Sequence, residues 1–110
     1  MKLKESVKIS GIKPEMVFVM IIIDSVYHEI VNQECTITSV SDGKHLNALH
    51  SVGYAIDLRS RDTDSNEQWS NRLKKRLAAK IRSRLTDEFD VVIESDHIHV
   101  EFDPRTRIHY

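Results

Sequence analysis

The sequence of 110 residues predicts one α+β domain, with a mainly antiparallel sheet and helices packed on one face. Three observations support this class. Two stretches repeat apolar residues at helical spacing, four short stretches have the composition or the alternation of strands, and their order is helix, strand, strand, helix, strand, strand. The length suits a single domain over residues 1–110, and 40% hydrophobic with 30% charged residues is typical of a globular protein.

The first half of the chain is expected to contain a helix and two strands. The helix starts at Pro14, because proline suits the first helical turn, and ends near residues 31–32. Cys35–Val40 is rich in β-branched residues and is predicted as a strand, followed by a turn over Ser41–Lys44. Gly53–Arg59 is predicted as the next strand. The core side of the helix is expected to consist of Met16, Val19, Met20, Ile23, Val26, Tyr27 and Ile30.

The second half is expected to contain a helix and a hairpin. Asp64 and Glu67 resemble a capping box, which would start the helix. Phe89–Glu94 and His97–Phe102 are predicted as strands joined at Ser95–Asp96. The helix has an apolar stripe at four-residue spacing, formed by Trp69, Leu73, Leu77, Ile81 and Leu85. Four basic residues lie elsewhere on this helix and are interpreted as a solvated face: Arg72, Lys75, Arg76 and Lys80.

Composition argues against two kinds of partner. The net charge of −1 gives no electrostatic reason to expect nucleic acid binding. The apolar run Met16–Ile23 is too short to span a membrane, and no cleavage site of a signal peptide follows it. We therefore expect a monomer that is made in the cytoplasm and that binds neither nucleic acid nor membrane.

Two histidines and a carboxylate are placed to hold a metal ion: His50, Asp57 and His99. Gly53 allows a sharp turn between His50 and the strand that carries Asp57, so these two side chains can converge. Catalytic zinc typically has three protein ligands and a fourth position for water, whose pKa it lowers to about 7. A structural zinc site usually needs several cysteines, and Cys35 is the only one. The set therefore predicts catalytic zinc.

The last strand also supplies candidates for the other catalytic roles. Alternation places His97, His99 and Glu101 on the face opposite the apolar residues 98, 100 and 102. Hydrolysis needs a general base beside the attacking water. Asp96, at the tip of the hairpin, is the favoured base, and Glu94 is the alternative that sequence reasoning leaves open.

Three stretches of the chain resemble the zinc D,D-peptidase and Hedgehog-like superfamily, in particular the M15 peptidases of bacteriophages. They are Ser41-Asp-Gly-Lys-His45, His50-Ser-Val-Gly-Tyr-Ala-Ile-Asp-Leu-Arg59 and Asp90-Val-Val-Ile-Glu-Ser-Asp-His-Ile-His-Val-Glu-Phe-Asp-Pro104. They follow the family's order and span about two-thirds of the chain. The resemblance implies the Hedgehog/D,D-peptidase fold.

The resemblance also implies roles for single residues. His50, Asp57 and His99 would be the zinc ligands, Asp96 the catalytic base, and His97 a residue that steadies the transition state. Many family members direct an arginine at the substrate after the Thr-Ser strand end. Here the nearest cation to Ser39 is Lys44, which makes these two residues candidates for substrate binding. A further departure is Ala48, where many members have serine.

The resemblance implies a D,D- or L,D-peptidase that acts on peptidoglycan stem peptides, as phage endolysins do. Such a protein would reach the cell wall at lysis or as part of a virion. Some members of the superfamily keep the fold and the zinc without peptidase activity. A non-catalytic zinc-binding or virion structural protein is therefore the alternative function.

Overall fold

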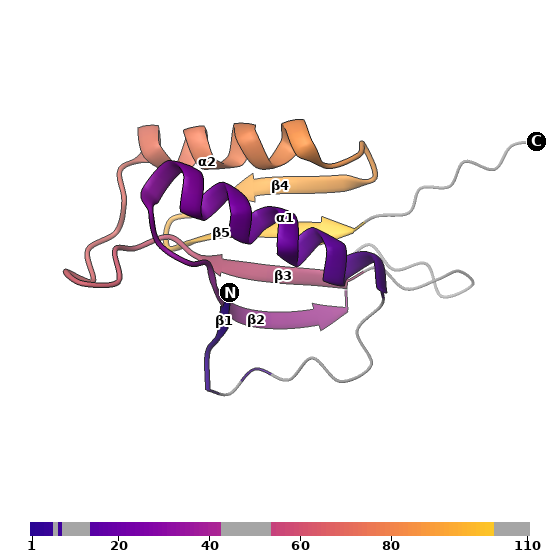
Figure 1. Ribbon diagram of the computed structural model, residues 1–110, viewed down its shortest axis with the longest axis horizontal. Coiled ribbons are helices and arrows are strands. Elements are labelled where there is room, and N and C mark those ends of the chain that lie inside the picture. Colours follow the sequence, from indigo (N-terminus) through magenta and orange to yellow (C-terminus); the bar gives the residue numbers. More distant parts are fainter. Residues whose placement is uncertain (6, 8–13, 43–53, 103–110) are drawn as a thin grey trace, which may run out of the picture.

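The computed structural model describes residues 1–5, 7, 14–42 and 54–102. The elements in this part of the chain are five strands and two helices (Figure 1). In chain order they are β1 (Lys2–Leu3), α1 (Pro14–Val31), β2 (Thr36–Asp42), β3 (Tyr54–Arg59), α2 (Asn71–Arg84), β4 (Phe89–Ile93) and β5 (His97–Phe102). The predicted α+β class and the order of its two helices and four long strands are confirmed.

All five strands form one sheet in the order β1-β2-β3-β5-β4. The pairs β2–β3, β3–β5 and β4–β5 are antiparallel, and only β1 runs parallel to its neighbour β2. The expected sheet is thus mainly antiparallel, with a parallel edge strand that the sequence did not reveal. A strand of two residues is too short to show the alternation by which strands are recognised.

One face of the sheet is apolar and is covered by the helices. Val40, Ile56, Val100 and Val91 form one row across the four long strands on this face. The predicted inner side of α1 and the middle of the α2 stripe are buried against such rows in a single core. The fully or nearly fully buried hydrophobic residues of the helices are Met16, Val19, Met20, Ile23, Val26, Tyr27, Leu77, Ala78 and Ile81.

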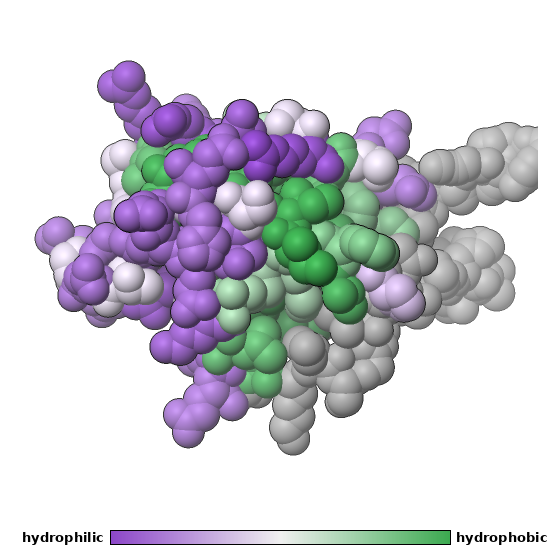
Figure 2. Space-filling view, in the orientation of Figure 1, coloured by the Kyte–Doolittle hydropathy of each residue, from purple (hydrophilic) through white to green (hydrophobic). Residues whose placement is uncertain are grey.

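The outer side of α1 remains apolar as well. Val17, Phe18 and Ile21 are exposed on it, and they contribute to the green surface in Figure 2. The apolar run Met16–Ile23 is therefore buried only on its inner side. No helix in the described part of the chain combines the length and the apolar character needed to cross a membrane.

Strands β2 and β4 each have one end that differs from the prediction by a single residue, and two other predicted boundaries are wrong by more. Asp64 and Glu67 form no capping box, because the Asp62 carboxylate accepts hydrogen bonds from the backbone N–H groups of residues 64 and 65 and holds them in a turn. Helix α2 instead starts after Ser70, whose Oγ accepts a hydrogen bond from the N–H of Leu73. Strand β2 also continues into the predicted turn, since Ser41 and Asp42 still pair with β3.

Candidate metal centre

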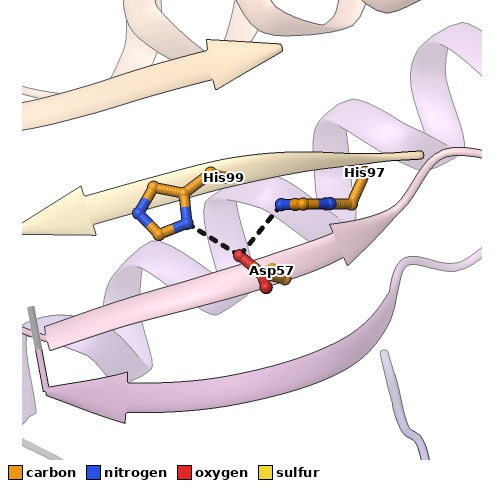
Figure 3. A group of neighbouring side chains, drawn as sticks. All are labelled: Asp57, His97 and His99. Atoms are coloured by element: carbon orange, nitrogen blue, oxygen red, sulfur yellow. Dashed lines mark hydrogen bonds and ion pairs between the residues drawn. The ribbon is translucent and has the colours of Figure 1, made fainter. Parts of the chain in front are cut away.

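Asp57 and His99 lie directly opposite each other on the neighbouring strands β3 and β5. Although they are 42 residues apart in the sequence, Nδ1 of His99 is 2.7 Å from Oδ1 of Asp57 (Figure 3). Both side chains are partly exposed. The structure therefore brings together two of the three metal ligands that the sequence predicts.

These two residues belong to a row that crosses the sheet on the face opposite the helices. The row runs from Ser39 on β2 through Asp57 and His99 to Val92 on β4. It alternates with the apolar rows because successive strand residues point to opposite faces. Figure 3 shows the helices behind the strands that carry Asp57 and His99. Ser39, a predicted substrate-binding residue, thus lies on β2 beside Asp57.

A second imidazole joins this pair. Nε2 of His97 lies 3.6 Å from Oδ1 of Asp57, and both histidines come from β5 (Figure 3). One ligand atom from each of Asp57, His97 and His99 can be chosen so that all three lie within 4.8 Å of one another. Sequence reasoning had kept His97 outside the ligand set. The alternation His97-x-His99 was the signal that could have placed both on one metal.

Two predicted site residues cannot be placed. His50, the third predicted ligand, and Lys44, the predicted substrate-binding cation, lie outside the described residues. The described part of the chain therefore holds an incomplete version of the predicted site, together with one additional candidate ligand.

His99 lies between two carboxylates. Its Nε2 is 3.0 Å from Oε1 of Glu101, while its Nδ1 faces Asp57. Burial alone would lower the pKa of His99, but the hydrogen bonds to Glu101 and Asp57 outweigh it, so the pKa is raised. Without a metal the two carboxylates favour the imidazolium form. A metal ion at Nδ1 would take the place of that proton.

The two candidate bases occupy different positions. Asp96 is exposed and its Oδ1 is 2.7 Å from Nδ1 of His97, so it approaches the ligand group through that histidine. This hydrogen bond lowers the pKa of Asp96, which weakens it as a base. Glu94 directly follows the last residue of β4 and lines the surface hollow beside His99.

This hollow has a volume of about 1110 Å³ and extends from the ligand group to the connection between α2 and β4. Arg82 is the only lysine or arginine among its described lining residues, and its guanidinium already donates a hydrogen bond to the carbonyl of Val91. Its acidic lining residues are Asp57, Asp87, Asp90, Glu94 and Glu101. An acidic hollow favours a cation, which agrees with a metal site.

The donor set fits a divalent transition metal. Imidazole nitrogens and a carboxylate oxygen are ordinary ligands of zinc and also of iron or manganese. The side chains of Asp57, His97 and His99 are 26%, 28% and 19% exposed, so an ion can reach them from solvent. The geometry thus supports a metal-binding group, and the identity of the metal is a separate question.

Comparisons with protein-family models, with curated proteins and with solved structures found no match to this chain.

Proposed function

We propose that this chain is a zinc peptidase related to the M15 family, which hydrolyses a peptide bond in peptidoglycan stem peptides. The observation that carries the proposal is the pairing of Asp57 with His99, whose ligand atoms meet on the helix-free face of the sheet. The sequence resemblance supplies the reaction class and the Hedgehog-like fold assignment. The enzyme would act as a carboxypeptidase or endopeptidase on the cell wall, at lysis or from a virion.

Asp57 and His99 would supply two of the zinc ligands. The third would be His50, as the resemblance implies, and His97 is the candidate that lies near Asp57. Zinc in such a site supplies Lewis acidity toward the substrate carbonyl and toward water. The acidic hollow would concentrate the cation near these ligands.

Side chains of the protein would transfer the proton and orient the substrate. Asp96 would accept a proton as water attacks and return it to the leaving amine, with Glu94 as the alternative base. His97 would steady the developing negative charge. Ser39, in the row of Asp57, would orient the peptide together with Lys44.

A non-catalytic zinc-binding or virion structural protein is the second candidate function. One observation favours it: the exposed carboxylate of Asp96 is tied to His97, and its pKa is lowered. A carboxylate held in this way is a poor base at neutral pH. In this case the chain would bind zinc without hydrolysing peptides.

One experiment separates these functions. The purified protein is analysed for metal content and incubated with purified peptidoglycan, and new amino groups are quantified. The wild type is expected to contain one zinc per chain and to release amino groups, and a chelator should abolish the release. Asp57→Ala and His99→Ala should lose both properties, while Asp64→Asn, on an exposed turn, should retain them. Zinc without release of amino groups supports the non-catalytic function, and a wild type without zinc contradicts both.

A further inference from the structure

Glu101 is a carboxylate buried on the face of the sheet that the helices leave uncovered. Only 4% of its surface is exposed, and carboxylates are rarely buried unless they are paired or hydrogen-bonded. It lies on β5 opposite Ala55 of β3 on one side and Asp90 of β4 on the other. The small side chain of Ala55 leaves room beside it. Neither the predicted ligand set nor the predicted base accounts for this residue.

Glu101 contacts the edge of the His99 ring that faces away from Asp57. Oε1 of Glu101 is 3.0 Å from Nε2, whereas Oδ1 of Asp57 is 2.7 Å from Nδ1. Turning the ring over would move both nitrogens away from these partners. The two carboxylates thus select one orientation of the ring.

We propose that Glu101 is a positioning residue. Its carboxylate accepts a hydrogen bond from the Nε2–H of His99 and thereby keeps Nδ1 directed at the metal position beside Asp57. The metal part of this inference rests on the proposed function. A histidine that binds a metal through one nitrogen commonly donates the other N–H to a carboxylate, which sets its tautomer and makes it a stronger ligand.

The backbone makes Glu101 suitable for this task. His99 and Glu101 are two residues apart on one strand, so their side chains project from the same face. Strand β5 is paired on both sides, with β3 and with β4, and its backbone is therefore held firmly. A buried, hydrogen-bonded carboxylate on such a strand can fix the imidazole ring within the narrow tolerance that a metal site requires.

Zinc affinity tests whether Glu101 makes His99 a stronger metal ligand. Competition with a chromophoric chelator gives the affinity of the wild type and of three variants. Glu101→Ala should weaken zinc binding about 10–100-fold. Glu101→Gln, whose amide oxygen can still accept the Nε2–H, should recover most of that loss. Glu67→Gln is the control, because it removes a carboxylate from an exposed residue that does not line the hollow. Its affinity should stay close to that of the wild type.

The ring orientation is measured separately, on the metal-free protein. NMR of the imidazole nitrogens should show a His99 Nε2–H that is protected from exchange in the wild type and in Glu101→Gln. The protection should disappear in Glu101→Ala, while thermal unfolding shows that this variant is still folded. This readout does not depend on zinc or on peptidase activity.

The outcomes are distinguishable. Equal zinc affinity in Glu101→Ala and wild type overturns the positioning role and leaves the proposed function intact. An unprotected Nε2–H in the wild type overturns the positioning role as well, whatever the affinities. If the wild type binds no zinc, the proposed function fails, and the Nε2–H signal still decides whether Glu101 holds the ring.

Discussion

The hydroxyl of Tyr27 in α1 donates a 2.7 Å hydrogen bond to the backbone carbonyl of Arg59 at the end of β3. Tyr27 is 1% exposed, and Asp57 lies two residues before Arg59 on the same strand. This bond fastens the long helix to the strand that carries a candidate metal ligand, from the opposite face of the sheet. It also satisfies the hydroxyl group of a buried side chain.

Replacing Tyr27 with phenylalanine should therefore lower the stability of the fold. The loss of a largely buried hydrogen bond is expected to cost about 1–2 kcal/mol, because the carbonyl of Arg59 would lose this partner. Urea unfolding measures the difference. Phe18→Ala is the control on the same helix, since Phe18 is 69% exposed and should change stability by about 0.5 kcal/mol or less. Equal stability of Tyr27→Phe and wild type would contradict the structural role.

The identity of the third metal ligand can be tested with two alanine variants. We expect His50→Ala to lose zinc and His97→Ala to retain it, as the sequence resemblance implies. Metal analysis after dialysis provides the measurement. His28→Ala is the control, because His28 lies exposed on α1 next to Asp24 and should keep full zinc content. The reverse pattern, with zinc lost only in His97→Ala, would make Asp57, His97 and His99 the ligand set.

The two candidate bases can be separated in the same way. Asp96→Asn is expected to keep the zinc and to lower peptidoglycan hydrolysis about 10²–10⁴-fold, which is the usual effect of removing a general base. Glu94→Gln should keep both zinc and most of the activity. Release of amino groups from peptidoglycan is the assay. If Glu94→Gln is the inactive variant, the base is Glu94 and the role given to Asp96 is wrong.

The single cysteine is expected to be chemically inert in the folded protein. Burial raises the pKa of the Cys35 thiol well above its ordinary value, so the reactive thiolate is scarce at neutral pH. Labelling with a thiol reagent at pH 7.5 should be slow in the native protein and fast in urea. Rapid labelling of the native protein would show that Cys35 is accessible.

Asp24 should make the fold sensitive to acid. Burial alone would raise its pKa, but the hydrogen bond from the backbone N–H of Cys35 and the ion pair with the N-terminal ammonium together outweigh this, and the pKa is lowered. Because the pKa of Asp24 is lower in the folded state, the carboxylate stabilises the fold fully above the unfolded-state pKa of about 3.9. This stabilisation is lost as the pH falls through the lower pKa of the folded state. Asp24→Asn should therefore be less stable at pH 7 by about 1 kcal/mol, and its difference from the wild type should shrink below pH 4. A difference that does not change with pH would contradict this account.

Much of the fold could be predicted because its elements have strong local signals. The inner side of α1, from Met16 to Ile30, repeats at helical spacing, and its predicted bounds agree with the observed Pro14–Val31. The strand His97–Phe102 was also predicted at its observed bounds. The predictions failed where a tertiary or medium-range contact determines the local structure. Asp62 organises the turn before α2 through hydrogen bonds to the next residues, and β1 forms a strand only by pairing with β2.

The candidate site shows the same division. Asp57 and His99 could be chosen as ligands because their residue types suit zinc and their strands have core residues at alternate positions. The closeness of His97 to Asp57 was missed, since alternation says which face a side chain occupies and not how close it comes to a residue on another strand. The burial of Glu101 was missed because it depends on which residues of β3 and β4 lie beside it in the sheet.

The sequence by itself determined which residues face the core and which lie on the open side of the sheet, because strand and helix periodicity follow from backbone geometry alone. Only the tertiary structure decided the register that sets Asp57 opposite His99 and Ala55 opposite Glu101. Register depends on how apolar rows from distant parts of the chain pack together beneath the helices, and a shift of one residue would turn the site toward the core. The grouping of Asp57, His97 and His99 as candidate metal ligands is thus a product of strand pairing.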